Sequence, residues 1–127
     1  MNMTTFLTNY WNDMARRDEV KLHEYFKPTA TIYLHDTNEI SDVSRVIGFN
    51  CRIIGYLNIA IDKIEKLENG QFVTVTFHRT EDWVGFITSF FTFEDSKIAE
   101  LHEYYAECDE IPQWRTDLSE HEKIKYY

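Results

Sequence analysis

The sequence predicts an α+β domain in which three N-terminal helices pack on a cone-shaped, curved antiparallel sheet. Three observations support this prediction. Helical periodicity dominates the first part of the chain, strand periodicity dominates the second, and 127 residues suit one domain. We therefore expect a single domain over residues 1–127, with residues 107–127 as a C-terminal tail and with a cavity between sheet and helices.

Two helices are predicted at the start of the chain. In residues 4–17 the apolar side chains recur on one helical face, at Phe6, Leu7, Tyr10, Trp11 and Met14. Asp18 is placed to cap a second, short helix, which we expect to run to Phe26 and to be stopped by Pro28.

The middle of the chain predicts one strand, a third helix and two further strands. Residues 29–35 are rich in β-branched and aromatic side chains and predict a strand. Ser41 is a candidate cap for a helix that ends near Gly55, in which the amide of Asn50 interrupts the apolar stripe. Buried amides need partners, so Asn50 either bonds to nearby backbone or faces a cavity. Strands are predicted over residues 58–67 and 72–79, and residues 111–114 are expected to dock on the domain.

A hairpin over residues 84–105 is the clearest pattern in the sequence. Its turn, residues 94–97, is polar and short. Alternation places Gly85, Ile87, Ser89, Phe91 and Phe93 on one face of the first strand and Phe86, Phe90 and two threonines on the other. In the second strand, alternation assigns Leu101, Glu103 and Tyr105 to one face and Ile98, His102 and Tyr104 to the other. Both faces carry aromatic rings, so both need a covering layer.

Composition narrows the classes of partner. The chain is 43% hydrophobic and 16% aromatic, and its formal net charge is -9. This balance disfavours nucleic acid and anionic membranes, because binding phosphates relies on clusters of Lys and Arg. With no export signal, no spanning segment and two isolated cysteines, we expect a cytoplasmic protein. The spacing of the 5 histidines predicts no metal site, and no motif predicts a cofactor.

The order of these elements resembles that of the nuclear transport factor 2-like superfamily, which includes ketosteroid isomerases and SnoaL-like polyketide cyclases. The resemblance is carried by Tyr10 on the first helix, by the helix-to-strand passage Phe26-Lys27-Pro28-Thr29-Ala30-Thr31-Ile32, and by Phe93, Ile98, Tyr104 and Tyr105 in the hairpin. The segment Ile111-Pro112-Gln113-Trp114-Arg115 is similar to tails of small bacterial SnoaL-like proteins.

The resemblance implies a pocket but argues against steroid isomerisation. The isomerases of the superfamily use a helix tyrosine and a strand acid as an oxyanion hole, with a carboxylate as base. Tyr10 matches the tyrosine, whereas Ser89 stands at the acid position and Leu34 at the base position, with His35 and Asp36 next to it. The resemblance also implies that Ser89 and Tyr105 point inward.

An inward Ser89 leaves an apolar face on the outside of the sheet. This face carries Phe86, Phe90, His102 and Tyr104. An exposed patch of this size on so small a domain favours association, so we expect a homodimer through the outer face.

The candidate site lies on the inner face. The candidate catalytic residues are Tyr10, Glu103 and Asp36, and the candidate ligand-binding residues are Trp11, Met14, His35, Asn50, Ile87, Ser89, Phe91 and Tyr105. Burial of Glu103 among rings would raise its pKa and suit it to acid–base chemistry; the alternative is a carboxylate that is simply paired inside the domain. His35 and Asp36 are adjacent and so point to opposite faces, and Asp36 has the alternative role of a turn cap.

Three functions are compatible with the sequence. The first is binding of a small apolar or aromatic ligand in the cavity. The second is a cofactor-independent isomerase, cyclase or dehydratase that uses acid–base residues in the same pocket. The third is a dimeric interaction protein whose cavity is filled by its own side chains.

Overall fold

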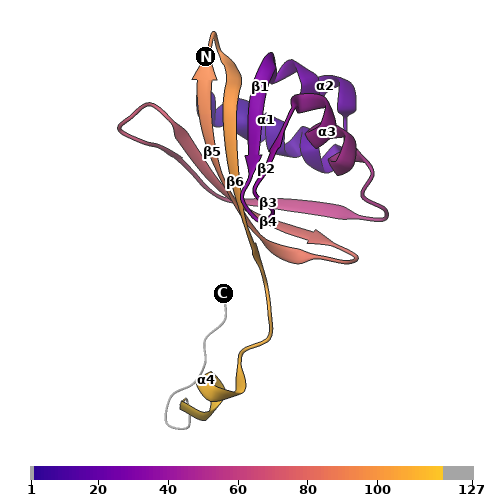
Figure 1. The fold of residues 1–127 in the computed structure, drawn as a ribbon, viewed down its shortest axis with the longest axis vertical. Helices are drawn as coiled ribbons and strands as arrows, with labels where there is room; N and C mark the ends of the chain where they lie inside the picture. Colours follow the sequence, from indigo (N-terminus) through magenta and orange to yellow (C-terminus); the bar gives the residue numbers. More distant parts are fainter. Residues whose placement is uncertain (1, 119–127) are drawn as a thin grey trace.

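The computed structural model describes residues 2–118, and Figure 1 shows how their helices and strands are arranged. The elements are α1 (Met3–Arg16), α2 (Glu19–Glu24), β1 (Phe26–Leu34), β2 (Glu39–Ser41), α3 (Val43–Cys51), β3 (Leu57–Lys66), β4 (Phe72–Thr80), β5 (Val84–Glu94), β6 (Lys97–Glu107) and α4 (Gln113–Leu118). None of the helices in this part of the chain is long and apolar enough to span a membrane.

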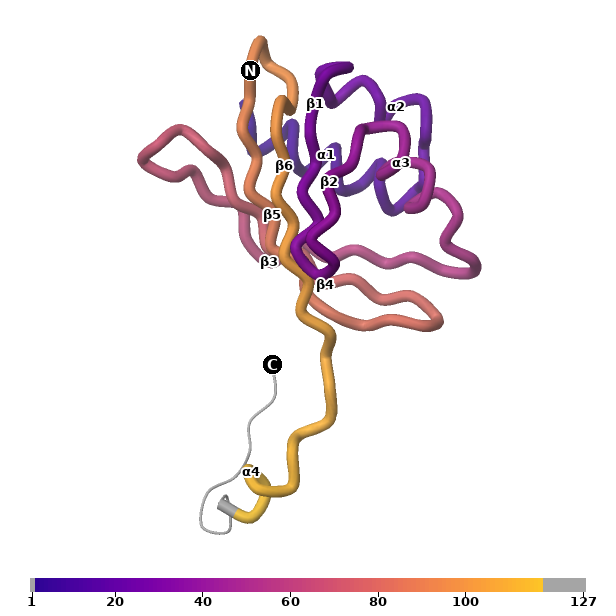
Figure 2. Tube along the Cα trace, viewed as in Figure 1, coloured from indigo at the N-terminus to yellow at the C-terminus, as the bar shows by residue number. Residues whose placement is uncertain are grey.

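Six strands form one sheet in the order β2-β1-β6-β5-β4-β3. Figures 1 and 2 show this sheet strongly bent, with α1, α2 and α3 gathered beside it. The predicted α+β class and the curved sheet are therefore confirmed. One pairing differs from the prediction: β1 joins β6 in parallel, and the other neighbouring pairs are antiparallel. A parallel pair needs a long connection, which here is the whole chain between β1 and β6.

The apolar stripe of α1 forms the centre of the core. Leu7, Tyr10, Trp11 and Met14 are buried. They belong to one cluster with the inner face of the sheet, which includes Ile32, Phe91, Ile98 and Leu101. Asn2 caps α1, because its side-chain oxygen accepts a hydrogen bond of 2.9 Å from the backbone N–H of Thr4.

Two boundaries near the N-terminus differ from the sequence prediction, and one strand was missed. Asp18 caps α2 as expected, but the helix ends at Glu24 and β1 already begins at Phe26. Pro28 thus lies inside β1, within the irregular stretch between Phe26 and Thr31, where a missing N–H removes no regular sheet bond. The short strand β2 was not predicted.

The third helix also starts and ends differently from its prediction. Asp42 caps α3, since its Oδ1 accepts a hydrogen bond of 2.8 Å from the N–H of Arg45. Ser41, the predicted cap, ends β2 instead. The helix stops at Cys51 rather than near Gly55, which has a positive φ of 80° and belongs to the loop before β3.

The β5–β6 hairpin matches its prediction in turn and in inner face, with one exception. Asp95 and Ser96 take positive φ values of 53° and 62°, which make the tight turn. The register shifts between Thr92 and Phe93, where β6 carries one additional residue. This bulge turns Ile98 into the core, although simple alternation placed it on the outer face.

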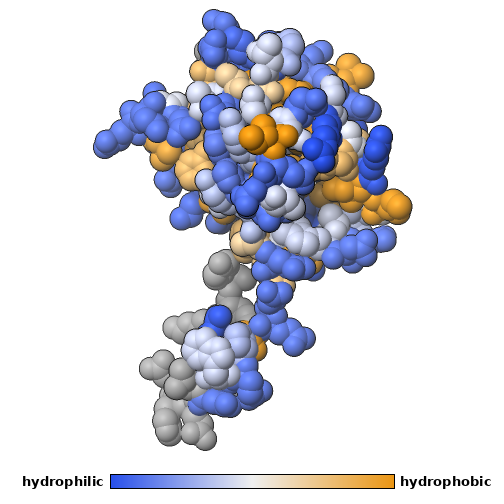
Figure 3. Space-filling view, in the orientation of Figure 1, coloured by the Kyte–Doolittle hydropathy of each residue, from blue (hydrophilic) through white to orange (hydrophobic). Residues whose placement is uncertain are grey.

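The segment after β6 extends away from the body of the domain (Figures 1 and 2). The expectation that residues 111–114 dock on the domain is wrong for Trp114, which is 61% exposed and lies against the guanidinium of Arg115. Residues 119–127 of the expected tail lie outside the described residues. Figure 3 shows that polar side chains dominate the face of the body in that view, with smaller apolar areas between them.

Candidate functional site

A cavity of about 440 Å³ lies between the inner face of the sheet, α1, α3 and the loops that follow them. Its wall combines aromatic and aliphatic side chains with a few polar groups. The lining residues are Trp11, Met14, Asp36, Phe49, Asn50, Ile53, Ile54, Leu57, Ile59, His78, Thr80, Asp82, Trp83, Ile87, Glu103 and Tyr105. Concave, mainly apolar sites of this size with a few convergent polar groups are typical of small-molecule binding.

Glu103 is the most deeply buried ionisable group in the wall of this cavity. It is 4% exposed, and its carboxylate accepts hydrogen bonds from the hydroxyls of Ser89 (3.1 Å) and Tyr105 (3.2 Å). Desolvation raises the pKa of Glu103 to about 7, and the negative charge of Asp36 adds to the rise. The two hydrogen bonds act in the opposite direction, because they stabilise the charged form. Glu103 can therefore both hold and release a proton near neutral pH.

The hydroxyl of Tyr105 stays protonated next to this carboxyl group. Burial, and then the charge of Glu103, raise the pKa of Tyr105 far above its ordinary value. The phenol therefore serves as a hydrogen-bond donor. Its ring also lies 6.1 Å from that of Trp83, measured between centroids, on the same wall of the cavity.

His35 and Asp36 separate as the alternation of a strand requires. Leu34 ends β1 with its side chain in the core, so His35 points to the outer face of the sheet, where its ring stacks on Tyr104 at 4.3 Å. The expectation that His35 lines the cavity is therefore wrong. Asp36, in the turn that follows, does line it.

Three other candidates lie in the core rather than in the wall of the cavity. Tyr10 and Phe91 are 1% and 0% exposed and pack against each other with centroids 5.7 Å apart. Burial raises the pKa of Tyr10 well above its ordinary value, and the charge of Glu103 contributes. Ser89, which is 0% exposed, acts behind the wall by donating to Glu103. All three were predicted to line the cavity, but they are buried in the core and are not among the residues that line it.

Four candidates do line the cavity as predicted: Trp11, Met14, Asn50 and Ile87. The indole N–H of Trp11 donates a buried hydrogen bond of 3.1 Å to the hydroxyl of Thr74, which fixes the orientation of the ring. The amide of Asn50 donates to the carbonyl of Val46 at 3.1 Å within α3. Asn50 thus combines the two roles left open by its sequence position.

His78 is the main residue that sequence reasoning missed. It lies on β4, is 6% exposed and is bonded to the hydroxyl of Thr76 at 2.7 Å. Its ring meets that of Trp11 edge to face at 5.4 Å. Burial lowers the pKa of His78 to about 4, so the ring is neutral at pH 7. The signal was the alternation of Thr74, Thr76 and His78, three polar residues on one face of a buried strand.

Trp83 and Phe49 were also missed, because loop and helix-end positions have no periodicity that fixes their direction. Trp83 precedes β5, and its ring lies against Gly85. A Cβ atom at Gly85 would be 2.6 Å from that ring and 2.5 Å from the carbonyl oxygen of Ala106. The glycine is thus what lets the indole reach the cavity.

The outer face of the sheet carries a hydrogen-bonded chain of three side chains. His35 Nε2 lies 2.8 Å from His102 Nδ1, and His102 Nε2 lies 2.6 Å from a carboxylate oxygen of Glu100. The ring of Tyr33 stacks on His102 at 4.3 Å. Within residues 2–118, no group of three or more His, Cys, Asp or Glu side chains is arranged to hold a metal ion.

The sequence matches no family model and no curated protein. The structure is nevertheless similar to many solved structures. An NTF-2-like protein of unknown function from Burkholderia xenovorans has a TM-score of 0.72 and 17% identity, covering 87% of this chain and 88% of that one. A ketosteroid isomerase-like protein from Kribbella flavida has a TM-score of 0.75 and 14% identity, covering 97% and 88%.

A third similar structure is that of a SnoaL-like protein. A SnoaL-like protein from Shewanella putrefaciens, proposed to be a polyketide cyclase, has a TM-score of 0.66 and 11% identity, covering 83% of this chain and 80% of that one. Identities this low show a shared fold and leave the activity open. The chain thus has the nuclear transport factor 2-like fold, which it shares with ketosteroid isomerase-like and SnoaL-like proteins.

Proposed function

We propose that this protein binds a small molecule with an apolar or aromatic body in the cavity beside α1 and α3. The observation that carries the proposal is the cavity itself. It has a volume of about 440 Å³, an aromatic and aliphatic wall, and Glu103 and Tyr105 as hydrogen-bonding groups on one side. An open space of this size also disfavours the alternative of an interaction protein with a filled cavity.

Glu103 gives the ligand a fixed orientation in this proposal. Its carboxyl group is held on both oxygens, by Ser89 and by Tyr105, so it cannot rotate freely. A group held in place loses little conformational entropy on binding, which favours one ligand pose over others. Trp11, fixed by Thr74, provides a flat wall for the apolar body.

Binding can be tested without knowing the natural ligand. Native mass spectrometry of the purified protein should reveal co-purified small molecules, and saturation-transfer NMR with 2-phenylethanol should report occupancy of the cavity. Ile59→Trp, in the cavity wall, should abolish the NMR signal, whereas Ile40→Trp adds the same bulk at a position that is 67% exposed. Equal signals from the two variants would contradict binding in this cavity.

A second candidate function is acid–base catalysis, as in an isomerase, cyclase or dehydratase. The observation that favours it is the pKa of Glu103, raised by burial to about 7, which suits a group that takes and returns a proton at neutral pH. Deuterium exchange from D₂O into phenylacetone tests this chemistry. Wild-type protein should exceed Glu103→Gln in exchange rate, and equal rates would remove the support for catalysis by Glu103.

We also propose that two copies associate through the outer face of the sheet. Phe86 and Phe90 are half-buried there, and Tyr104 is 46% exposed. The rings of Phe90 and Tyr104 contact each other, with centroids 5.8 Å apart, and a second copy would cover these apolar side chains. Sedimentation velocity should show a dimer for the wild type and a monomer for Phe90→Glu. A wild-type monomer at micromolar concentration would overturn this proposal.

A further inference from the structure

All charged groups in the described wall of the cavity are negative. The carboxylates are Asp36, Asp82 and Glu103, and no Lys or Arg is among the described residues that line the space. His78 adds no positive charge at neutral pH, because burial lowers its pKa to about 4. The electrostatic potential inside the cavity therefore favours a cation and opposes an anion.

The arginine that borders the neighbouring pocket already has a partner. Arg45 of α3 borders a smaller neighbouring pocket, which shares Asp36, Phe49 and Tyr105 with the main cavity. Its guanidinium pairs with Glu39 at 2.6 Å and donates to the hydroxyl of Ser41 at 3.3 Å. This pairing offsets the charge of Arg45, so it does not supply a binding group for an anionic ligand.

Aromatic rings surround the same space on several sides. Trp11 comes from α1, Phe49 from α3, Trp83 from the β4–β5 loop and Tyr105 from β6. The faces of aromatic rings attract ammonium groups, Trp most strongly, and the attraction increases when the ion is removed from water. Aliphatic side chains, such as Ile53 and Leu57, complete the wall and suit an uncharged body.

We propose that the ligand of this cavity is a small organic cation, in which an ammonium group is attached to an apolar or aromatic body. The ammonium group would lie between the carboxylates of Glu103 and Asp36 and the rings of Trp83 and Tyr105. The body would rest on Trp11 and the aliphatic side chains. This inference rests on the proposed binding function and adds the chemical class of the ligand.

Charge on Glu103 links binding to pH. A bound ammonium group stabilises the carboxylate form, so the affinity for a cation should increase as the pH rises through about 7, the pKa to which burial brings Glu103. The groups around this carboxyl are Ser89 and Tyr105 on the sheet, Asp36 in the β1–β2 turn and Tyr10 on α1. His78 and Asp82 line other parts of the cavity.

Three probes of similar shape separate charge from fit: 2-phenylethylammonium, 2-phenylethanol and 3-phenylpropanoate. Binding to the full chain is measured by saturation-transfer NMR and calorimetry at low salt, between pH 6 and pH 8.5. At pH 8 the ammonium should bind about tenfold more tightly than the alcohol, and the propanoate should bind most weakly. The affinity of the ammonium should fall severalfold towards pH 6, while that of the alcohol stays constant.

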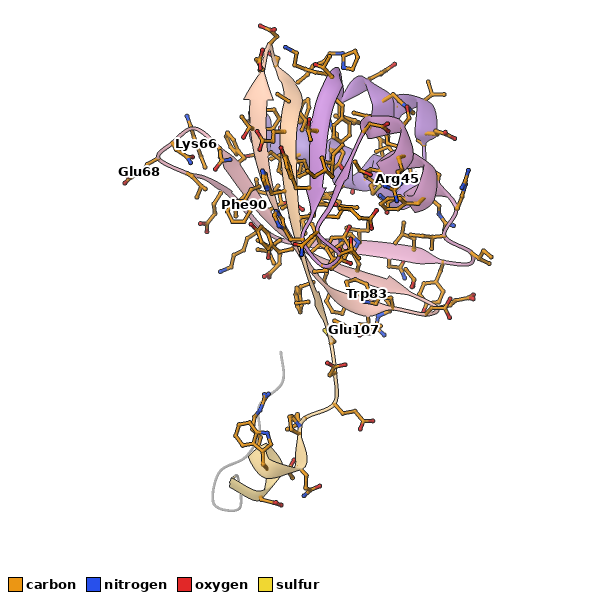
Figure 4. All side chains as sticks on the ribbon, viewed as in Figure 1. Arg45, Lys66, Glu68, Trp83, Phe90 and Glu107 are labelled. Carbon is orange, nitrogen blue, oxygen red and sulfur yellow. The ribbon has the colours of Figure 1, made fainter. Side chains whose placement is uncertain are left out.

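Matched variants assign the effect to the site. Glu103→Gln and Asp36→Asn should each reduce the preference for the ammonium over the alcohol, while binding of the alcohol persists and shows that the cavity is intact. Glu68→Gln removes the same charge at the exposed tip of the β3–β4 hairpin, which Figure 4 shows far from Trp83 and Arg45, and should change nothing.

The outcomes distinguish the two proposals. If the alcohol or the propanoate binds as tightly as the ammonium at pH 8, the ligand is not a cation, although the binding function stands. If none of the three probes binds at about 10 mM, the wider binding function is contradicted as well. Retention of the preference in both Glu103→Gln and Asp36→Asn would also overturn the cation inference, because its two carboxylates would then play no part.

Discussion

The hydroxyl of Ser89 on β5 donates a hydrogen bond of 3.1 Å to the carboxylate of Glu103, its direct partner in the register with β6. Both side chains are buried on the inner face of the sheet. Because the two residues are opposite each other, a side chain of the neighbouring strand holds the carboxyl group in place. Burial therefore raises the pKa of Glu103, and the fixed hydrogen-bond donors lower it.

The first prediction concerns this hydrogen bond. Ser89→Ala should raise the pKa of Glu103 above about 7, because the lost bond stabilises the charged form. The expected rise is roughly one pKa unit, the equivalent of a hydrogen bond to a charged group. Titration of carbon-13-labelled glutamate carboxyl groups by NMR measures it. Thr88→Ala, at the preceding position of β5 on its outer face, should leave the titration of Glu103 unchanged.

The second prediction concerns stability and pH at Glu103. Burial raises its pKa from 4.5 to about 7, so between these values the folded protein holds a proton that the unfolded chain has lost. The wild type therefore loses stability as pH rises through this window, by about 3 kcal/mol in total. The free energy of unfolding of Glu103→Gln, measured by urea denaturation, should therefore increase by this amount relative to that of the wild type between pH 4 and pH 8. A difference independent of pH would contradict the raised pKa.

The third prediction has the opposite sign. Burial lowers the pKa of His78 from 6.5 to about 4, so at intermediate pH the unfolded chain binds a proton that the folded protein does not. The wild type loses stability at this site as pH falls from 6.5 towards 4, by about 3 kcal/mol.

In the variant His78→Gln, this loss of stability at low pH should be absent. The free energy of unfolding of the wild type minus that of His78→Gln should thus decrease as the pH falls. The wild type should also show a flatter pH dependence between pH 4.5 and pH 6.5 than either single variant, because the slopes from Glu103 and His78 oppose each other there. Parallel curves for wild type and His78→Gln would refute the assignment.

The fourth prediction tests the close approach of Trp83 to β5. Gly85→Ala places a Cβ atom 2.5 Å from the carbonyl oxygen of Ala106 and 2.6 Å from the ring of Trp83. It should destabilise the fold by about 1–3 kcal/mol and change the tryptophan fluorescence as the indole moves.

A second glycine provides the control. Gly48 lies in α3, and a Cβ atom there would meet nothing within 4 Å. Gly48→Ala should therefore stabilise the protein by up to about 1 kcal/mol, because alanine favours the helix. Chemical denaturation of both variants gives the comparison, and a similar change of stability in the two would show that Trp83 is not packed against Gly85.

Prediction from the sequence worked best at positions where local periodicity fixes the direction of a side chain. Ile87 and Glu103 both line the cavity. Strand alternation grouped each of them with the side chains that share its face, and the resemblance implied that this face is the inner one. The same rule separated His35 from Asp36, although it did not say which of the two would face inward. It failed at Ile98, where one additional residue in β6 reverses the alternation.

By itself, the sequence determined the α+β class, the β5–β6 hairpin and the fact that Glu103 shares a strand face with Leu101 and Tyr105, because hydrophobic periods of 3.6 and 2 are local properties of the chain. That this face is the inner one was implied by the resemblance to the nuclear transport factor 2-like superfamily. Only the tertiary structure decided that β1 pairs with β6 in parallel and that Tyr10 and Phe91 are sealed in the core. It also decided that His78 and Trp83 complete the cavity. Such contacts form between segments that are far apart in the sequence, and local periodicity does not predict which of these segments meet.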